Sequence, residues 1–290
     1  MTPTLVKYVG SKAGFLEDHA GLLPMPAPGG AVAVTFTGGG SIAAHYRARG
    51  CRVIASDINP RLVHAHVQVR DDVEAVIDAL GNLATALRLA DHGGEDELAG
   101  RAFFEEVRGR LDGYAEDLRA ARFLFILRAG FNGLYRENST AECTTAYGKP
   151  GPGVDLIQAD KLRAYSAAVQ GIEFLCEDFA VTCGRCRPGW VASLDSPYEG
   201  TFTGYAAGDW DAKQASLPGM GGTSDRERLA AMLVYLDAIG VRWANHDADT
   251  AATRRLYSGW HYTPIQRAGN VNSNGDDRGA VQEGLWRNCP

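Results

Sequence analysis

The chain has 290 residues, 45% of them hydrophobic, and a formal net charge of −6, which fits one large globular domain or two modest ones. It has no run of about 18 apolar residues, and its first residues lack an apolar export segment. We therefore expect neither a membrane span nor secretion, but a cytoplasmic protein. The negative charge alone argues against a nucleic-acid partner, because such a partner usually meets a basic surface.

A first strand is predicted over residues 31–36, a short apolar run that ends in Thr37-Gly38-Gly39-Gly40-Ser41. An amphipathic stretch over 42–49 predicts a helix, and a second strand over 52–56 ends at Asp57. Strand, glycine turn, helix, strand and terminal acid together indicate a βαβ unit.

The glycine turn and the terminal acid of this unit predict a nucleoside-bearing cofactor. At Gly38 to Gly40 no side chain keeps a ligand away from the backbone. Asp57 can accept hydrogen bonds from two ribose hydroxyls. The pattern lacks the third glycine of a dinucleotide fingerprint, so it does not distinguish NAD from S-adenosylmethionine.

The middle of the chain is predicted to be helical over 62–89 and 96–134, with a polar break at 91–94. Its arginines fit either a DNA-facing patch or a solvated helix face, because acidic residues interleave with them. They are Arg101, Arg108, Arg110, Arg119, Arg122, Arg128 and Arg136. The segment 148–153, rich in Pro and Gly, marks a boundary.

The last part alternates again between helices and strands, which indicates one mostly parallel sheet with the helical middle inserted into its chain path. The predicted elements are a helix over 157–170, strands over 172–175 and 190–194, a glycine-rich loop over 199–223, a helix over 225–239 and a strand over 241–245. Residues 254–286 give no clear pattern.

The six cysteines are scattered, and we expect free thiols. Cys183 and Cys186 form a CxxC, but no second ligand pair stands at zinc-site spacing. No metal site is predicted.

Asp195-Ser196-Pro197-Tyr198 directly follows the strand over 190–194 and suits the exocyclic amine of a flat base. Asp195 can accept one N–H and the Ser196 carbonyl the other, while Tyr198 can stack on the ring. Pro197 has no N–H, so only acceptors face the amine. Taken alone, such a tetrapeptide is more often a turn.

Considered together, these strings resemble the Dam-like (D12 class) DNA adenine methyltransferases over nearly the whole chain. The matching strings follow the family's order, and the one over 131–138 is the most specific. They are Lys7-Tyr8-Val9-Gly10-Ser11-Lys12, Phe36-Thr37-Gly38-Gly39-Gly40-Ser41, Ser56-Asp57-Ile58-Asn59-Pro60, Phe131-Asn132-Gly133-Leu134-Tyr135-Arg136-Glu137-Asn138, Tyr147-Gly148-Lys149, Asp178-Phe179 and Asp195-Ser196-Pro197-Tyr198.

The resemblance implies an α/β fold, with a Rossmann-like S-adenosylmethionine-dependent methyltransferase sheet and an inserted, mainly helical target-recognition domain. Residues 1–61 and 154–290 would form the catalytic domain, and 62–153 the DNA-binding domain. The implied activity is site-specific transfer of a methyl group from S-adenosylmethionine to the N6 amine of a flipped adenine. The implied partner is double-stranded DNA, and a monomer is expected.

The resemblance also implies roles for individual residues. Asp57 would hold the ribose, Ile58 would pack on the adenine of the cofactor, and Asp178 would meet its amine. The implied cofactor pocket consists of Tyr8, Lys12, Phe36, Gly38, Gly40, Asp57, Ile58, Asp178, Phe179 and Asp195. The implied catalytic residues are Asp195, Ser196, Pro197 and Tyr198.

Five residues would contact DNA by the same resemblance. Arg136 suits a bidentate contact to guanine, with a surface salt bridge as the alternative. The implied DNA-binding residues are Asn132, Arg136, Asn138, Tyr147 and Lys149.

The implied mechanism follows from the target. The N6 amine is buried in the base stack, so the base must be flipped at a cost of a few kcal/mol. Hydrogen bonds from the amine to Asp195 and to the Ser196 carbonyl would favour a pyramidal nitrogen with an available lone pair. Transfer then depends mainly on positioning, with neither a metal nor a covalent intermediate.

The sequence departs from the family at three places. Val34-Thr35 replace an acid and a proline, Ser196 replaces a proline, and residues 143–146 differ from the family's hairpin. The alternatives are therefore a weak or inactive DNA-binding homologue, a methyltransferase for another acceptor, and an NAD-dependent oxidoreductase. The target sequence and the biological role, restriction–modification included, stay open.

Overall fold

The computed structural model describes residues 2–6, 11–111, 116–138, 140–196, 225–267 and 281–290. Within this part of the chain one seven-stranded sheet forms, with strand order β3-β2-β1-β4-β5-β7-β6. The strands are β1 (Ala31–Thr35), β2 (Arg52–Asp57), β3 (Glu173–Cys176), β4 (Val191–Asp195), β5 (Arg242–Ala248), β6 (His261–Arg267) and β7 (Val281–Arg287).

The first five strands are parallel to one another, and β7 runs antiparallel between β5 and β6. The predicted mostly parallel α/β sheet is therefore confirmed. β1 is buried along its whole length, as expected of a parallel strand covered on both faces. Its side chains alternate between the two sides, Val32 and Val34 packing in one apolar cluster and Ala33 in the other.

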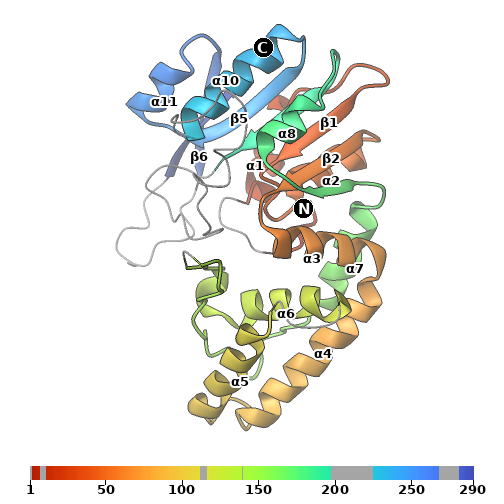
Figure 1. Ribbon diagram of the computed structural model, residues 1–290, viewed down its shortest axis with the longest axis vertical. Helices are drawn as coiled ribbons and strands as arrows, with labels where there is room; N and C mark the ends of the chain where they lie inside the picture. Colours follow the sequence, from red (N-terminus) through yellow and green to blue (C-terminus); the bar gives the residue numbers. More distant parts are fainter. Residues whose placement is uncertain (1, 7–10, 112–115, 139, 197–224, 268–280) are drawn as a thin grey trace.

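Helices cover both faces of this sheet (Figure 1). Phe15 and Ala44 pack in the same apolar cluster as Val32 and Val34, whereas Phe179 and Leu233 pack with Ala33 on the other side. The short or sheet-covering helices are α1 (Ala13–His19), η1 (Ala20–Leu22), α2 (Ser41–Ala48), α8 (Phe179–Gly184), α10 (Asp225–Ala238) and α11 (Ala251–Leu256).

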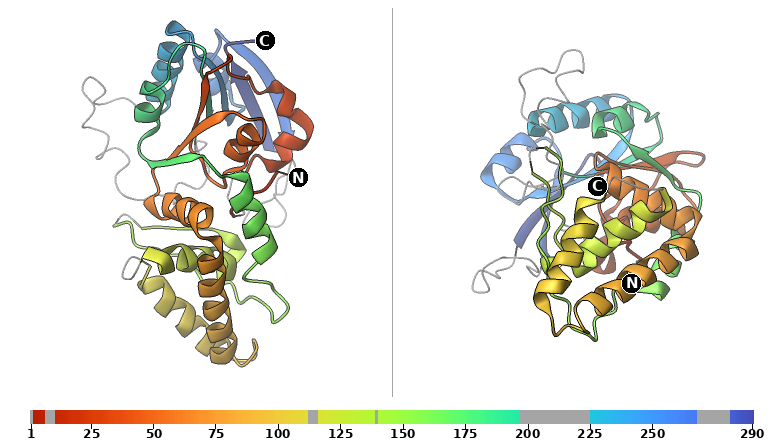
Figure 2. Two further views of the ribbon diagram at one scale, coloured as in Figure 1. Left: turned by 90° about the vertical axis from the view of Figure 1, so that its right-hand side faces the viewer. Right: turned by 60° about the horizontal axis from the view of Figure 1, so that its bottom comes forward.

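The chain between β2 and β3 forms a second, helical layer beyond the end of the sheet, seen at the bottom of Figure 1 and again from the side in Figure 2. Its elements are α3 (Pro60–Asp71), α4 (Val73–Ala90), α5 (Glu97–Gly109), α6 (Glu116–Ala129), η2 (Phe131–Gly133) and α7 (Ala159–Ala168). α6 lies at its centre and packs against α3, α4 and α5. All five residues from Phe123 to Leu127 are buried, as expected of a helix surrounded on every side.

The prediction of two unbroken helices over 62–89 and 96–134 is wrong, because each range is divided in the structure. The first is divided at Asp72, which leaves helical geometry (φ −146°, ψ 72°) and accepts a hydrogen bond from the Ala75 N–H as the N-cap of α4. The second consists of α5, α6 and η2. The polar break at 91–94 is confirmed, since it separates α4 from α5.

The predicted short elements agree with the structure to within a few residues, whereas α1, α8, α11, β6 and β7 were not predicted. The glycine-rich loop expected over 199–223 lies outside the described residues. All six cysteines are free thiols, as predicted. In the described part of the chain, no helix has the length and apolar character needed to cross a bilayer.

Candidate functional site

The strand order reverses between β1 and β4, because β2 and β3 lie on one side of β1 and β4 and β5 lie on the other. In open α/β sheets ligands bind at such a point, beyond the carboxyl ends of the strands. Thr35, Asp57 and Asp195 end β1, β2 and β4. Sequence motifs that lie far apart along the chain thus meet at one edge of the sheet.

The loop after β1 turns sharply and is fixed to the neighbouring strand. Phe36, Gly38 and Gly40 all have positive φ angles, of 56°, 50° and 81°. The Thr37 backbone N–H and its hydroxyl both donate to the Ser56 carbonyl, at 3.0 and 2.9 Å. The loop is therefore held tightly against the end of β2.

Gly40 is required by sterics as well as by its φ angle. A Cβ at this position would lie 2.1 Å from the Tyr165 hydroxyl oxygen. Tyr165 is fully buried on α7, so it cannot move aside into solvent. The glycine predicted to admit a cofactor thus also admits a tyrosine from behind the loop.

Tyr165 and His66 form a buried strut behind the glycine loop, and no sequence motif predicted it. Burial lowers the pKa of His66, on α3, to about 4, so its ring is neutral. Its Nε2 lies 2.9 Å from the Gly38 carbonyl oxygen, which only accepts, so Nε2 carries the proton. Nδ1 then accepts from the Tyr165 hydroxyl at 2.7 Å, and burial keeps that hydroxyl protonated by raising the pKa of Tyr165.

Asp57 connects the end of β2 to the glycine loop. Its carboxylate accepts the Gly38 N–H and the Asn59 N–H, each at 3.1 Å. Burial raises the pKa of Asp57, and the backbone N–H groups of Asn59, Gly38 and Ile58 lower it. Ile58, next to it, is half-buried. A carboxylate held this rigidly at a strand end is a suitable acceptor for ligand hydroxyls.

A second carboxylate, Asp178, lies at the start of α8. Its Oδ1 accepts the Ala180 N–H at 2.8 Å and the Arg228 guanidinium at 3.1 Å. Its Oδ2 is buried and accepts no hydrogen bond from any described residue. A buried acceptor of this kind normally has a donor, so Oδ2 is suited to receive one from a ligand.

Phe179, the residue after Asp178, belongs to an aromatic pair. Phe179 stacks on Phe36, with ring centroids 5.2 Å apart and planes inclined by 29°. The Arg228 guanidinium lies 5.0 Å from the centre of the Phe179 ring. Arg228 is nearly fully buried on α10, and no sequence motif predicted its role. Phe36, Asp178 and Phe179, predicted from two motifs, are therefore brought together.

Asp195, at the end of β4, is held by a buried lysine. Lys12 Nζ lies 2.8 Å from Asp195 Oδ1 and 3.7 Å from Glu283 Oε2. Lys12 and Glu283 are only 2% and 3% exposed, whereas Asp195 is 22% exposed. Ser196 follows and is half-buried. Of the predicted residues, Tyr8, Pro197 and Tyr198 lie outside the described part of the chain.

The predicted DNA-contacting residues follow α6. Four of them lie on the hairpin over 130–147, and Lys149 comes two residues after it. Asn132 is exposed and has a φ of 56°. The Arg136 N–H donates to the Thr145 hydroxyl at 3.0 Å, and isolated bridges pair Glu137 with Cys143 and Gly130 with Tyr147. Arg136 is half-buried.

Three of the predicted DNA contacts have structural roles of their own. The Asn138 side-chain oxygen accepts the N–H groups of Thr140 and Glu142, at 3.0 and 2.9 Å, and so holds the hairpin turn. The exposed Lys149 pairs with Glu97 at 2.8 Å. Tyr147 is buried against Phe104.

Arg61 fastens this hairpin to the beginning of α3, only four residues after Asp57. It donates to the Tyr135 hydroxyl at 2.7 Å and to the Ala141 carbonyl at 3.0 Å, and it forms an ion pair with Glu137. The Tyr135 hydroxyl in turn donates to Glu137 at 2.5 Å. Glu137 is buried, so this pair is shielded from water.

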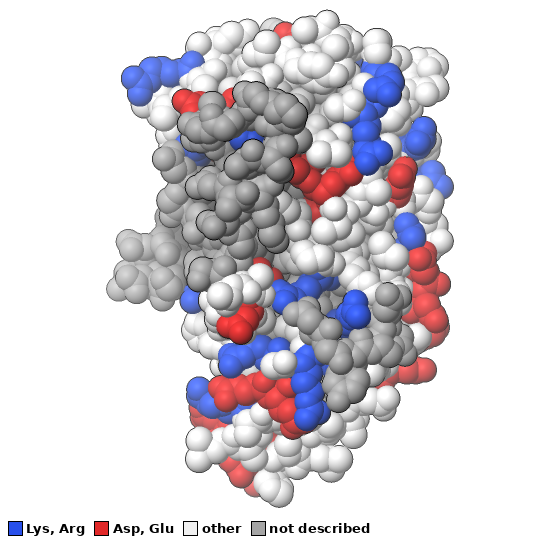
Figure 3. All heavy atoms as spheres, in the orientation of Figure 1, with Lys and Arg blue, Asp and Glu red and all other residues white. Residues whose placement is uncertain are grey.

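Most of the mid-chain arginines have partners within the protein. Arg108 and Arg128 donate to the backbone carbonyls of Thr145 and Ile157, and burial lowers the pKa of Arg128 to about 10. Arg101 and Arg110 pair with glutamates one turn away on α5. Figure 3 shows acidic and basic side chains next to each other over the helical layer. For these four arginines the structure favours local pairing over a DNA-facing patch.

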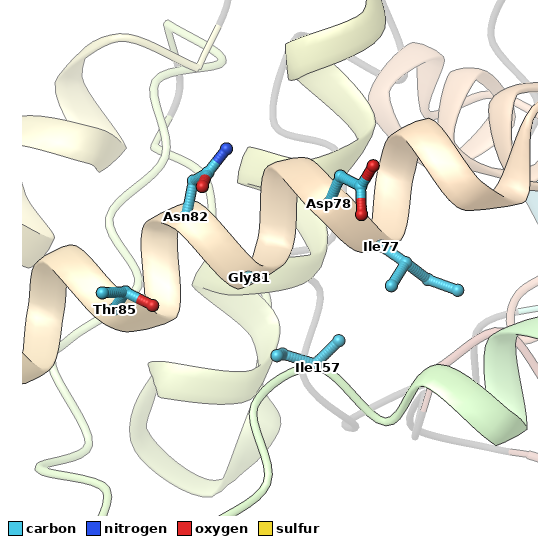
Figure 4. A pocket seen from close by; sticks show the side chains of 6 residues that line it. All are labelled: Ile77, Asp78, Gly81, Asn82, Thr85 and Ile157. Atoms are coloured by element: carbon cyan, nitrogen blue, oxygen red, sulfur yellow. The ribbon is translucent and has the colours of Figure 1, made fainter.

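A hollow lies between α4 and Ile157 (Figure 4). It is lined by Ile77, Asp78, Gly81, Asn82, Thr85 and Ile157. None of the six is a predicted site residue. Among the described residues, no group of three or more His, Cys, Asp or Glu side chains could hold a metal ion.

Comparison with known proteins gives one consistent family. A model of the D12 class N6 adenine-specific DNA methyltransferases matches residues 8–266. The DNA adenine methylase of Haemophilus influenzae is 27% identical, over 80% of this chain and 76% of that protein. The Retron Ec67 DNA adenine methylase of Escherichia coli is 25% identical, over 96% and 89%. The Type II methyltransferase M.MjaIII of Methanocaldococcus jannaschii is 24% identical, over 94% of each chain.

Proposed function

The chain belongs to the D12 class of N6 adenine-specific DNA methyltransferases, and from that premise we propose that it moves a methyl group from S-adenosylmethionine to the N6 amine of a flipped adenine in double-stranded DNA. Adenine-specific DNA methylation is the activity of the family and of its named relatives. The methyl donor, the flipped base and the residue roles are the parts that we add. A monomer and a cytoplasmic location stay predictions from the sequence.

Three features support a pocket for S-adenosylmethionine. The glycine loop gives a ligand close access to backbone. Asp57 offers a fixed carboxylate to ribose hydroxyls, and Asp178 Oδ2 is a buried acceptor suited to an adenine amine. Phe36 and Phe179 add an apolar, aromatic wall. The residues present therefore fit this donor, which supplies an electrophilic methyl group on a positively charged sulfur when bound.

The roles of Asp195 and Ser196 follow from the chemistry of the target amine. Its lone pair is delocalised into the base, which makes it a weak nucleophile. Asp195 and the Ser196 carbonyl would each accept one N–H and so favour a pyramidal nitrogen. Asp195 is suited to this because it is the partly exposed member of an otherwise buried cluster. Its contribution is to orient the amine and to stabilise positive charge as it develops there.

Recognition of DNA is assigned to the segment 62–153, which we propose as the target-recognition domain. Asn132 and Arg136 would meet the bases, while Asn138, Tyr147 and Lys149 would hold or flank the hairpin that carries them. The exposure of Asn132 and the anchoring of the hairpin by Arg61 support this assignment.

The single observation that carries the proposal is the convergence of Asp57, Asp178 and Asp195 at one edge of the sheet. The test is to incubate the protein with unmethylated genomic DNA and tritiated S-adenosylmethionine, and to map modified adenines by single-molecule sequencing. We expect N6-methyladenine at a recurring short site, abolished in Asp195→Ala. Asp160→Ala, at a fully exposed position on α7, is the matched control and should retain activity.

Cofactor binding without methyl transfer would contradict the proposal and favour an inactive DNA-binding homologue. Methyl transfer to RNA or a small molecule, but not to DNA, would indicate another acceptor.

A further inference from the structure

Three charged side chains from distant parts of the chain, Asp195 among them, lie together at the end of β4. Lys12 immediately precedes α1, Asp195 ends β4, and Glu283 lies on β7. Lys12 Nζ lies between the two carboxylates, 2.8 Å from one and 3.7 Å from the other. Glu283 lies beyond residues 8–266, the part of the chain that the family model matches.

The sheet register places the two carboxylates on the same face. Asp195 pairs with His246 on β5, and His246 pairs with Leu285 on β7. Glu283 is two residues before Leu285, so its side chain points to the same side. α1 covers this face, since Phe15 packs edge-on against His246 at 4.6 Å. The cluster is therefore built into the fold.

Because the cluster is buried, its charges must compensate one another. Lys12 and Glu283 are almost completely removed from water, and a buried charge is costly unless an opposite charge compensates it. Lys12 supplies a positive charge to both carboxylates. Asp195 is the carboxylate with access to solvent, so it is the one that a ligand can reach.

The proposed chemistry needs Asp195 to accept an N–H of the target amine. In the structure Lys12 already binds Asp195 Oδ1. A carboxylate that fully neutralises one ammonium is a weaker acceptor than one that shares it. We propose that Glu283 is a positioning residue that draws on the same Lys12 ammonium and so keeps Asp195 a strong acceptor for the amine. This inference rests on the proposed function.

A purely structural role for Glu283 makes a different prediction. If Glu283 only compensated the buried charge of Lys12, its removal would lower stability and leave turnover per folded molecule unchanged. If it tunes Asp195, its removal lowers kcat while the affinities for S-adenosylmethionine and DNA persist, because Glu283 touches neither ligand in the proposed arrangement.

The test compares Glu283→Gln and Glu283→Asp with the wild-type protein. Tritium transfer to unmethylated genomic DNA gives kcat, calorimetry with S-adenosylmethionine gives its Kd, and thermal unfolding gives Tm. We expect Glu283→Gln to lower kcat by about tenfold or more, as for loss of one partner of a buried charge pair. The Kd for S-adenosylmethionine should stay within about twofold, and Glu283→Asp, which retains the charge, should have an intermediate kcat.

Asp247→Asn is the matched control. Asp247 is a fully buried carboxylate on β5 that pairs with Arg226 at 3.2 Å. It pairs in register with Gly284, so its side chain lies on the sheet face opposite Glu283. Its substitution should lower Tm and leave kcat unchanged.

A wild-type kcat in Glu283→Gln would overturn the inference, as would an equal fall in kcat for Asp247→Asn. If Glu283→Gln does not fold, an unchanged kcat in Glu283→Asp overturns it. Failure of the proposed function is a separate result, because then the wild-type protein itself does not methylate DNA.

Discussion

Tyr165→Phe tests whether the buried strut behind the glycine loop positions that loop. The substitution removes one hydroxyl, which donates to His66 Nδ1 at 2.7 Å, and leaves the ring in place. Both side chains are fully buried, so no water replaces the lost donor. A buried acceptor left without a partner costs about 1–3 kcal/mol.

The expected loss of about 2 kcal/mol in the free energy of unfolding corresponds to a fall in Tm of about 3–4 °C for a chain of this size. Since His66 also holds the Gly38 carbonyl, we expect part of this free-energy loss to destabilise the position of the glycine loop. If about 1 kcal/mol of it does, the Kd for S-adenosylmethionine rises about fivefold. Thermal unfolding measures the first quantity and titration calorimetry the second.

Tyr235→Phe, at an exposed position on α10, is the matched control and should change stability by less than about 0.5 kcal/mol. Unchanged stability in Tyr165→Phe would refute the hydrogen bond itself. Lower stability with unchanged cofactor affinity would refute the positioning of the loop.

Two further predictions concern acid stability and the DNA-binding hairpin. Burial lowers the pKa of His66 to about 4, so its contribution to stability is complete above pH 6.5 and is lost as the pH falls through 4, by an amount on the order of 3 kcal/mol. Urea unfolding between pH 7.5 and 4 checks this, and a His66→Gln variant with the wild-type pH dependence would contradict it. Arg61→Met leaves Glu137 buried without its cation, so the free energy of unfolding should fall by about 3–5 kcal/mol. DNA affinity by mobility shift should fall while the Kd for S-adenosylmethionine stays within about twofold, and unchanged DNA binding would show that Arg61 does not hold the hairpin.

The parts of the fold that sequence predicted are those with local causes. The run over 31–36, the glycines after it and Asp57 specify a βαβ unit because strand burial and turn geometry depend on adjacent residues. The continuity of the helix over 62–89 was wrong because Asp72 caps a new helix there, a choice that apolar periodicity does not reveal.

The missed site residues have long-range causes. His66 and Tyr165 are 99 residues apart in the chain and meet only because α3 packs against α7. Arg228 reaches Asp178 from α10, and Glu283 reaches Lys12 from a strand that was not predicted. No spacing rule connects such pairs, so only the packed structure brings them together.

Helix α3 contacts both the DNA-binding hairpin and the glycine loop. These two contacts determine where a chimera with altered target preference can be joined. The first turn of α3 carries Arg61, which hydrogen-bonds to the hairpin. Its middle carries His66, which hydrogen-bonds to the glycine loop. If the graft begins at residue 62, His66 comes from the donor protein, and the host's Gly38 carbonyl meets a foreign partner. A graft of residues 73–158, between α3 and α7, would leave His66 and Tyr165 with the host, and it would have to supply Tyr135 and Glu137 as partners for the host's Arg61.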